Sequence, residues 1–138
     1  YFSVPKNLYI IATLSTTRES SPFSDYSLRR RFAFYEMNPA FGTPEFENFK
    51  SAFSNKKLDK LIKVIMDFNK SLPSDSTDPN IFQLGHSYFC DRDLTQDQAI
   101  EHIAKFEIIP LISTFFDGLS DRQEIIKLWT QKILAAVK

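Results

Sequence analysis

The chain has 138 residues, of which 43% are hydrophobic and 14% aromatic, so it is long enough to bury one substantial core. Its 17 basic and 17 acidic residues cancel, which excludes attraction of the whole chain to nucleic acid or to an anionic membrane. The single cysteine, Cys90, excludes an intrachain disulfide and indicates a cytoplasmic protein. No apolar run reaches the roughly 20 residues that cross a bilayer, so no membrane association is expected.

The first part of the chain carries the patterns of strands. Residues 7–13 read NLYIIAT, a continuous apolar run that predicts a strand covered on both faces. A polar loop is predicted for residues 14–24, a short helix for 25–31 and an aromatic strand for 32–37. Because two strands are not a stable sheet, we expect this chain, which starts at Tyr1, to be a fragment whose sheet partners lie outside it.

From Thr43 the pattern becomes helical. Thr43 and Pro44 supply a cap and a first-turn proline, which together predict the start of a helix. Two apolar stripes at helical spacing follow and predict two helices that face a core. The stripes consist of Phe46, Phe49 and Phe53 in the first helix, and of Leu58, Leu61, Ile62, Ile65, Phe68 and Leu72 in the second.

Two further helices are predicted from capping boxes, Thr95 with Gln98 and Ser120 with Gln123. Pro110 is expected to interrupt or kink the first of these helices. The core positions predicted for them are Ala99, Ile100, Ile103 and Phe106, then Ile125, Leu128, Trp129 and Ile133. The predicted fold class is therefore mainly α with a small α/β part, in which about four or five helices form a bundle.

Few residues suggest chemistry. Arg29, Arg30 and Arg31 form the densest positive charge, and the planar fork of arginine suits phosphate, although the residues equally allow a solvated turn or structural ion pairs. His86 follows Gly85, which would permit a tight turn, and its ring could reach a ligand or be a structural hydrogen-bonding group.

Two kinds of site are not expected. His86, Cys90 and His102 lack a fourth ligand at suitable spacing, so no metal site is predicted. The chain has no GxxxxGK[ST] loop and no GxSxG elbow, so it holds no complete active site by itself.

Two motifs carry a resemblance to a known family. Residues 8–17 (LYIIATLSTT) and 25–34 (DYSLRRRFAF) resemble a segment of McrB-type AAA+ NTPases, in which a buried strand ends in Gly-Thr-Met-Asn-Thr-Ala-Asp-Arg-Ser and a short helix ends in Leu-Arg-Arg-Arg-Phe. Residues 83–89 (QLGHSYF) and 108–112 (IIPLI) resemble the lid signature of the same family. The motifs occur in the family's order and cover nearly the whole chain.

The resemblance implies a domain organisation and roles for single residues. Residues 1–42 would be the end of the AAA+ α/β core, and residues 43–138 the helical lid. Ser15 would occupy the position of the sensor asparagine. Arg29 and Arg30 match the arginine-finger region, which reaches the γ-phosphate held by a neighbouring subunit. Residues 85–87, that is Gly85, His86 and Ser87, would contact the nucleotide from the lid.

The resemblance also implies partners and substrates for the parent protein. These are GTP or ATP with magnesium, a hexameric homo-oligomeric ring, a nuclease subunit, and modified or phage DNA bound through a separate N-terminal domain. The fragment alone would be inactive and would bind no nucleotide tightly.

The chain departs from the family pattern at Ser15, Arg18 and Glu19, which replace Asn, Asp and Arg. These departures put the subunit's own hydrolysis in doubt, whereas its arginine cluster is intact. They leave open a second interpretation, a non-catalytic helical interaction or regulatory module derived from an AAA+ protein.

Overall fold

The computed structural model describes residues 5–13, 27, 30–35, 37–72, 83–116 and 120–138. The chain divides into two compact units, Tyr1–Phe34 and Tyr35–Lys138. The two units are considered separately below. In the described part of the chain no helix is long and apolar enough to cross a membrane.

The described residues of the first unit form no regular strand. Residues 5–13 contain a turn at residues 6–7, and their large apolar side chains are exposed, with Tyr9 at 89% and Ile11 at 96%. Residues 32–35 and Met37 are likewise outside any strand. The strands predicted for residues 7–13 and 32–37 are therefore not formed among the described residues. The physical reason is that a strand needs a neighbouring strand to pair its backbone N–H and C=O groups.

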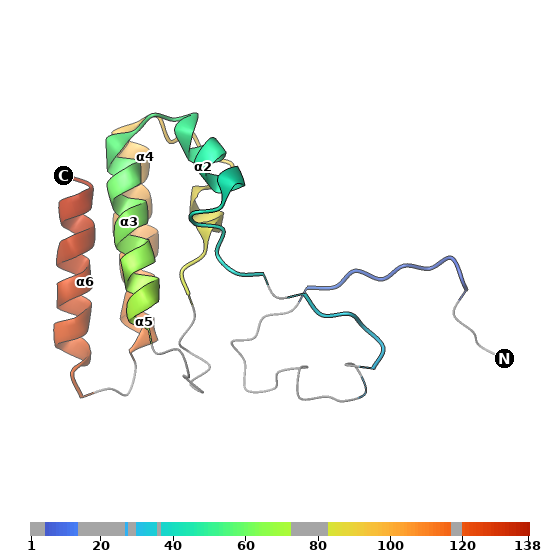
Figure 1. Ribbon diagram of the computed structural model, residues 1–138. Helices are drawn as coiled ribbons and strands as arrows, with labels where there is room; N and C mark the ends of the chain where they lie inside the picture. Colours follow the sequence, from blue (N-terminus) through green and yellow to red (C-terminus); the bar gives the residue numbers. More distant parts are fainter. Residues whose placement is uncertain (1–4, 14–26, 28–29, 36, 73–82, 117–119) are drawn as a thin grey trace. The chain divides into compact units, whose positions relative to one another are not determined.

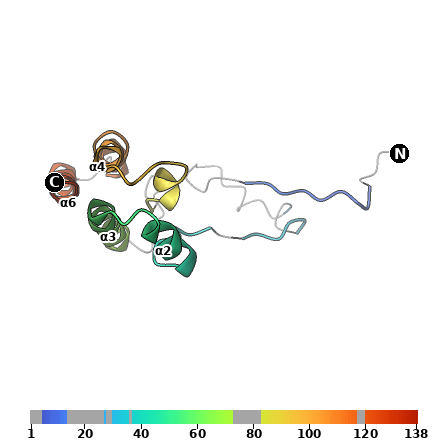
Figure 2. The same ribbon diagram turned by 90° about the horizontal axis from the view of Figure 1, so that it is seen from above.

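The second unit is helical, which confirms the prediction of a mainly α chain. Its elements are α2 (Pro44–Ser51), α3 (Lys56–Ser71), η2 (His86–Phe89), α4 (Asp97–His102), η3 (Ile103–Ile108), α5 (Ile109–Phe115) and α6 (Arg122–Ala136). Figures 1 and 2 show α3, α6 and the run from α4 to α5 side by side with their axes aligned. The short helices α2 and η2 lie beside this bundle (Figure 2).

The start of α2 is the predicted one. The hydroxyl of Thr43 accepts a hydrogen bond from the backbone N–H of Phe46 at 3.3 Å, and Pro44 occupies the first turn. Asn55 caps α3 in the same way, since its side-chain oxygen accepts from the backbone N–H groups of Lys57 and Leu58. Both caps satisfy N–H groups that a helix cannot pair internally.

The capping boxes predicted for the later helices are wrong. Helix α4 begins at Asp97 without a side-chain cap, because the Thr95 hydroxyl bonds instead to the carboxylate of Asp93 at 2.6 Å. A nearby Asp offers such a hydroxyl a local partner that competes with the helix. Helix α6 begins after Asp121, also without a side-chain cap, and the Ser120 hydroxyl bonds to the Asp121 carboxylate.

Pro110 leaves the helical run unbroken, but the six residues of η3 before it form a π-helix. Proline has no N–H and its ring crowds the carbonyl four residues earlier, so a wider turn accommodates it. The extra residue rotates the following side chains around the axis. As a result Ile108 is fully buried, whereas Phe106, predicted to be in the core, is 67% exposed.

The core is built around α3, whose five predicted core positions from Leu58 to Phe68 are all buried. Phe68 packs edge-on against Trp129 of α6, with ring centroids 5.3 Å apart. Helix α6 also contacts α5 and η3. Of the core positions predicted in α6, Trp129 and Ile133 are buried, but Leu128 is 48% exposed and that prediction is wrong.

Ion pairs join the helices at the surface. Lys57 of α3 lies 3.0 Å from Glu101 and 3.2 Å from Asp97 of α4, and Glu101 also pairs with Lys105 at 2.9 Å. These exposed pairs are individually weak, but they connect α3 to the α4–η3 run at the end where both helices begin.

Candidate functional site

Most of the site residues that the sequence predicts within residues 1–42 lie outside the part of the chain that the structure describes. Ser15 and Arg29 are outside it, as are Arg18 and Glu19. Arg30 is described and lies exposed in a turn at residues 30–31. The sensor and arginine-finger roles therefore stay predictions. The part of the site whose geometry is described is the turn at residues 85–87, called the lid turn below.

Gly85 lies just before η2, and its backbone conformation does not require glycine. Its φ of −83° and ψ of 169° are open to any residue. A Cβ atom added there would meet only the Ser87 hydroxyl, at an ordinary 3.8 Å. A tight turn does follow Gly85, in η2, but it does not depend on glycine at this position.

His86 is half-buried and has a structural partner. Its Nδ1 accepts a hydrogen bond from the backbone N–H of Ala40 at 3.1 Å, and its ring lies edge-on to Phe41 and Phe46. This contact occupies Nδ1, because a ring nitrogen that accepts a hydrogen bond cannot donate one as well. Nδ1 thus holds the 39–41 segment against the lid, and Nε2 is the atom left for a ligand.

Asn69 of α3 fixes the segment that leads into the turn. Its side-chain oxygen accepts from the Leu84 N–H at 2.8 Å, and its NH₂ group donates to the Leu84 carbonyl at 2.9 Å. Both polar atoms of the amide are therefore engaged. Sequence reasoning missed this residue, and the only signal was a polar side chain beside the apolar stripe at Phe68.

The far end of η2 is anchored by an ion pair. Arg92 makes two hydrogen bonds from its guanidinium to the carboxylate of Glu107 in η3. Burial raises the pKa of the Tyr88 hydroxyl, and the charge of Glu107 raises it further. The Cys90 thiol donates to the His86 carbonyl at 3.7 Å. The lid turn is therefore held at both ends, and Ser87 remains exposed on it.

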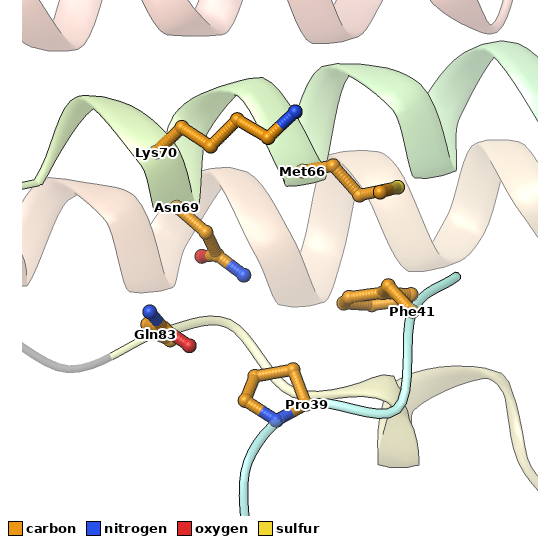
Figure 3. A pocket seen from close by; sticks show the side chains of 6 residues that line it. All are labelled: Pro39, Phe41, Met66, Asn69, Lys70 and Gln83. Carbon is orange, nitrogen blue, oxygen red and sulfur yellow. The ribbon is translucent and has the colours of Figure 1, made fainter. Parts of the chain in front are cut away.

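A cleft opens beside the turn. Its volume is about 190 Å³. Figure 3 shows the side chains around it, which come from the 39–41 segment, from α3 and from the segment before η2. The lining residues are Pro39, Phe41, Met66, Asn69, Lys70 and Gln83. Within the described residues, the side chains of Gln83 and Lys70 make no hydrogen bond or ion pair, so the two are available to a ligand.

A metal site is not assembled among the residues that the structure describes, since no three His, Cys, Asp or Glu side chains are grouped to hold an ion. The three residues considered from the sequence are engaged separately. Cys90 bonds to a backbone carbonyl, and His86 to the N–H of Ala40. His102 instead lies over Phe106, with its Nδ1 3.6 Å from Glu107.

Comparison with known proteins identifies the helical unit. A family model described as "McrB, alpha-helical lid domain" matches residues 60–125, from within α3 to the beginning of α6. A curated relative, the "Type IV methyl-directed restriction enzyme EcoKMcrB subunit" of Escherichia coli (strain K12), is 35% identical over 144 residues. This chain belongs to the McrB family. The alignment covers 96% of this chain, which spans only 30% of the length of the McrB relative. No solved structure matches the chain.

Proposed function

We propose that this McrB-family chain is the arginine-finger and lid part of an AAA+ motor subunit that hydrolyses GTP or ATP with magnesium. The parent complex would restrict modified DNA or defend against phage. The observation that carries the proposal is the helical unit, whose residues 60–125 match the McrB lid and include the turn at residues 85–87. In this view the lid closes over a nucleotide held by the α/β core, and Nε2 of His86 faces that nucleotide.

The arginine cluster would act across a subunit boundary. Negative charge grows on the oxygens of the transferred phosphoryl group, and a guanidinium from a neighbour stabilises it in the transition state. Arg29 and Arg30 are the proposed fingers, and a hexameric ring would place each pair at the site of the next subunit. Ser15, at the sensor position, is too short to hold the attacking water as asparagine would, so this subunit's own hydrolysis would be slow.

The exposed apolar side chains of residues 8–11 support a place beside an α/β core. Leu8, Ile10 and Ile11 expose half or more of their surface, which is costly for a run of this kind. We propose that residues 7–13 and 32–37 complete a sheet with core strands of the parent protein. The phosphate loop and the magnesium-binding carboxylates would belong to that core.

The remaining partners follow from the relative, which is named as a subunit of a methyl-directed restriction enzyme. A nuclease subunit would respond to movement of the lid, and a separate N-terminal domain would bind DNA. The assembly would work in the cytoplasm. The 138-residue chain alone would neither hydrolyse nor tightly bind nucleotide.

The test uses the full-length subunit with Arg29→Ala and Arg30→Ala, and Arg31→Ala as a control with the same loss of charge. A true finger is expected to contribute roughly 10³- to 10⁵-fold to the hydrolysis rate, so at least one of the first two variants should lose most activity. Mixing that variant with subunits whose phosphate loop is inactivated should restore hydrolysis, because mixed boundaries then pair an intact loop with an intact arginine. Wild-type rates in both variants would instead favour the non-catalytic module.

A further inference from the structure

We infer that the outward face of α3 binds the phosphate backbone of duplex DNA through a row of lysines, so that the helical unit itself contacts DNA. The choice of DNA as the ligand rests on the function proposed above. The row is called the lysine stripe and consists of Lys56, Lys60, Lys63 and Lys70, all of which are exposed. This contact would add to DNA binding by the separate N-terminal domain.

The lysine stripe lies on the side of α3 opposite the core. Its spacing of four, three and seven residues keeps the lysines within an arc of roughly 80° around the helix axis, over a length of about 21 Å. The buried residues Leu61, Ile65 and Phe68 occupy the other side of the helix. Figure 2 shows α4, α6 and α2 beside α3, and these described helices leave one side of α3 uncovered.

The lysines of the stripe differ from a neighbouring lysine that already has acidic partners. Lys57, on the flank of the helix, forms ion pairs with Asp97 and Glu101 of α4. Within the described part of the chain, no lysine of the stripe makes a side-chain hydrogen bond or an ion pair. Asp67 stands in line with them between Lys63 and Lys70, so positive charge predominates along the row. The ammonium groups are therefore open to an external anion.

The composition of this face favours a phosphate backbone over a protein partner. Every position in line with the stripe is charged, and none is apolar or aromatic. Protein interfaces usually have an apolar centre and are depleted in lysine. Lysine contacts to phosphate need no apolar neighbour and supply binding that does not depend on sequence. Single strands are commonly held by aromatic side chains that stack on the bases, so a duplex backbone fits this face better.

Local charge of this kind is compatible with a chain whose 17 basic and 17 acidic residues cancel. Salt screens exposed charges that lie more than about 10 Å apart at 0.1 M ionic strength. A phosphate close to α3 therefore responds to the lysines of the stripe more than to the acids elsewhere in the chain. Neutrality of the whole chain limits attraction at long range, but not contact at this surface.

The experiment measures binding of a short unmethylated DNA duplex to the full-length subunit, without nucleotide, by fluorescence anisotropy between about 50 and 200 mM salt. Poly-glutamate is a second probe, which represents an acidic protein. The test variant combines Lys56→Gln, Lys60→Gln and Lys63→Gln, because glutamine removes the charge and forms helices about as well as lysine. Lys70 is left in place because it also lines the cleft beside the lid turn.

Two further variants serve as control and as gain of function. The control combines Lys127→Gln, Lys132→Gln and Lys138→Gln, which removes the same charge from exposed positions on or after α6. Asp67→Lys replaces the acid in line with the stripe by another cation and should add one phosphate contact. This variant keeps the inference testable even if the triple variant folds poorly, because unfolding would not raise the affinity for DNA.

Each lysine–phosphate contact contributes about 0.9 to the steepness with which log K falls against log salt concentration. The test variant should therefore reduce this steepness by roughly 2–3, Asp67→Lys should increase it by up to about 0.9, and the control should match wild type. Wild-type steepness in both the test variant and Asp67→Lys would overturn the inference. An equal reduction in the control would also overturn it, since net charge and not the stripe would then attract DNA.

The remaining outcomes separate this inference from its alternatives. If the test variant loses affinity for poly-glutamate while its DNA binding is unchanged, the stripe binds an acidic protein and the inference is wrong. Wild-type hydrolysis rates in Arg29→Ala and Arg30→Ala would refute the proposed function but leave the DNA measurements readable, because DNA binding is measured without nucleotide.

Discussion

Replacing Asn55, the residue that caps α3, with alanine should destabilise the helical unit. Asn55 is 9% exposed and stands at the junction of two helices. Its side-chain oxygen caps α3 by accepting from Lys57 and Leu58. Its NH₂ group donates to the Thr95 carbonyl at 3.3 Å and to the Asp97 carboxylate at 3.1 Å, just where α4 begins.

The expected magnitude follows from these four hydrogen bonds. Loss of an N-cap side chain costs about 1 kcal/mol. Each of the two bonds to the α4 region adds roughly 0.5–1 kcal/mol, the usual net contribution of an intramolecular hydrogen bond to stability. We therefore expect Asn55→Ala to lower the free energy of unfolding by roughly 2–3 kcal/mol. Urea unfolding followed by far-UV circular dichroism would measure the change.

Asn55→Asp separates the two contributions. It keeps the capping oxygen but removes the donated bonds and sets a second carboxylate beside Asp97, so its loss should reflect the α3–α4 junction alone. Asn48→Ala is the matched control, because Asn48 is exposed on α2 and should change stability by less than about 0.5 kcal/mol. The reasoning would be refuted if Asn55→Ala cost no more than that control.

Two further predictions concern packing and charge. Phe68→Ala should lower the free energy of unfolding by roughly 3–5 kcal/mol, because the Phe68 side chain is fully buried. Phe106→Ala should lower it by less than about 1 kcal/mol, because the π-helix turns Phe106 towards solvent. Equal losses for the two variants in urea unfolding would contradict this placement of Phe106. Hydrogen bonds from Lys105 and Lys57 lower the pKa of Glu101. The contribution of Glu101 to the stability of the fold is therefore fully present above its unfolded-state pKa of about 4.3. It is lost as the pH falls through the lower pKa of the folded state. Glu101→Gln should reduce the fall in Tm that accompanies acidification over this pH range. An unchanged fall would contradict the ion pairs of Glu101 with Lys57 and Lys105.

The candidate site shows where prediction from sequence reached and where it stopped. The GHSYF motif directed attention to His86, and the structure shows that its ring accepts a hydrogen bond from Ala40, which lies between two residues that line the cleft. Its partner Ala40 lies 46 residues away, so no local pattern could reveal the bond. Asn69 was missed for the same reason. The cleft gathers side chains from three separate segments, which only packing of those segments brings together.

The sequence by itself determined the α3 core stripe, the Thr43 cap of α2 and the membership of the McrB family. These depend on residues close together in the chain, so spacing and motif carry the information. Only the tertiary structure decided which side of the α4–α5 run is buried, because the π-helix before Pro110 shifts the phase that a constant period assumes. It also decided the hydrogen-bond partner of the His86 ring and the failure of the Thr95 cap. Each of these depends on which of several nearby polar groups wins a hydrogen bond, and that competition is settled by the folded geometry.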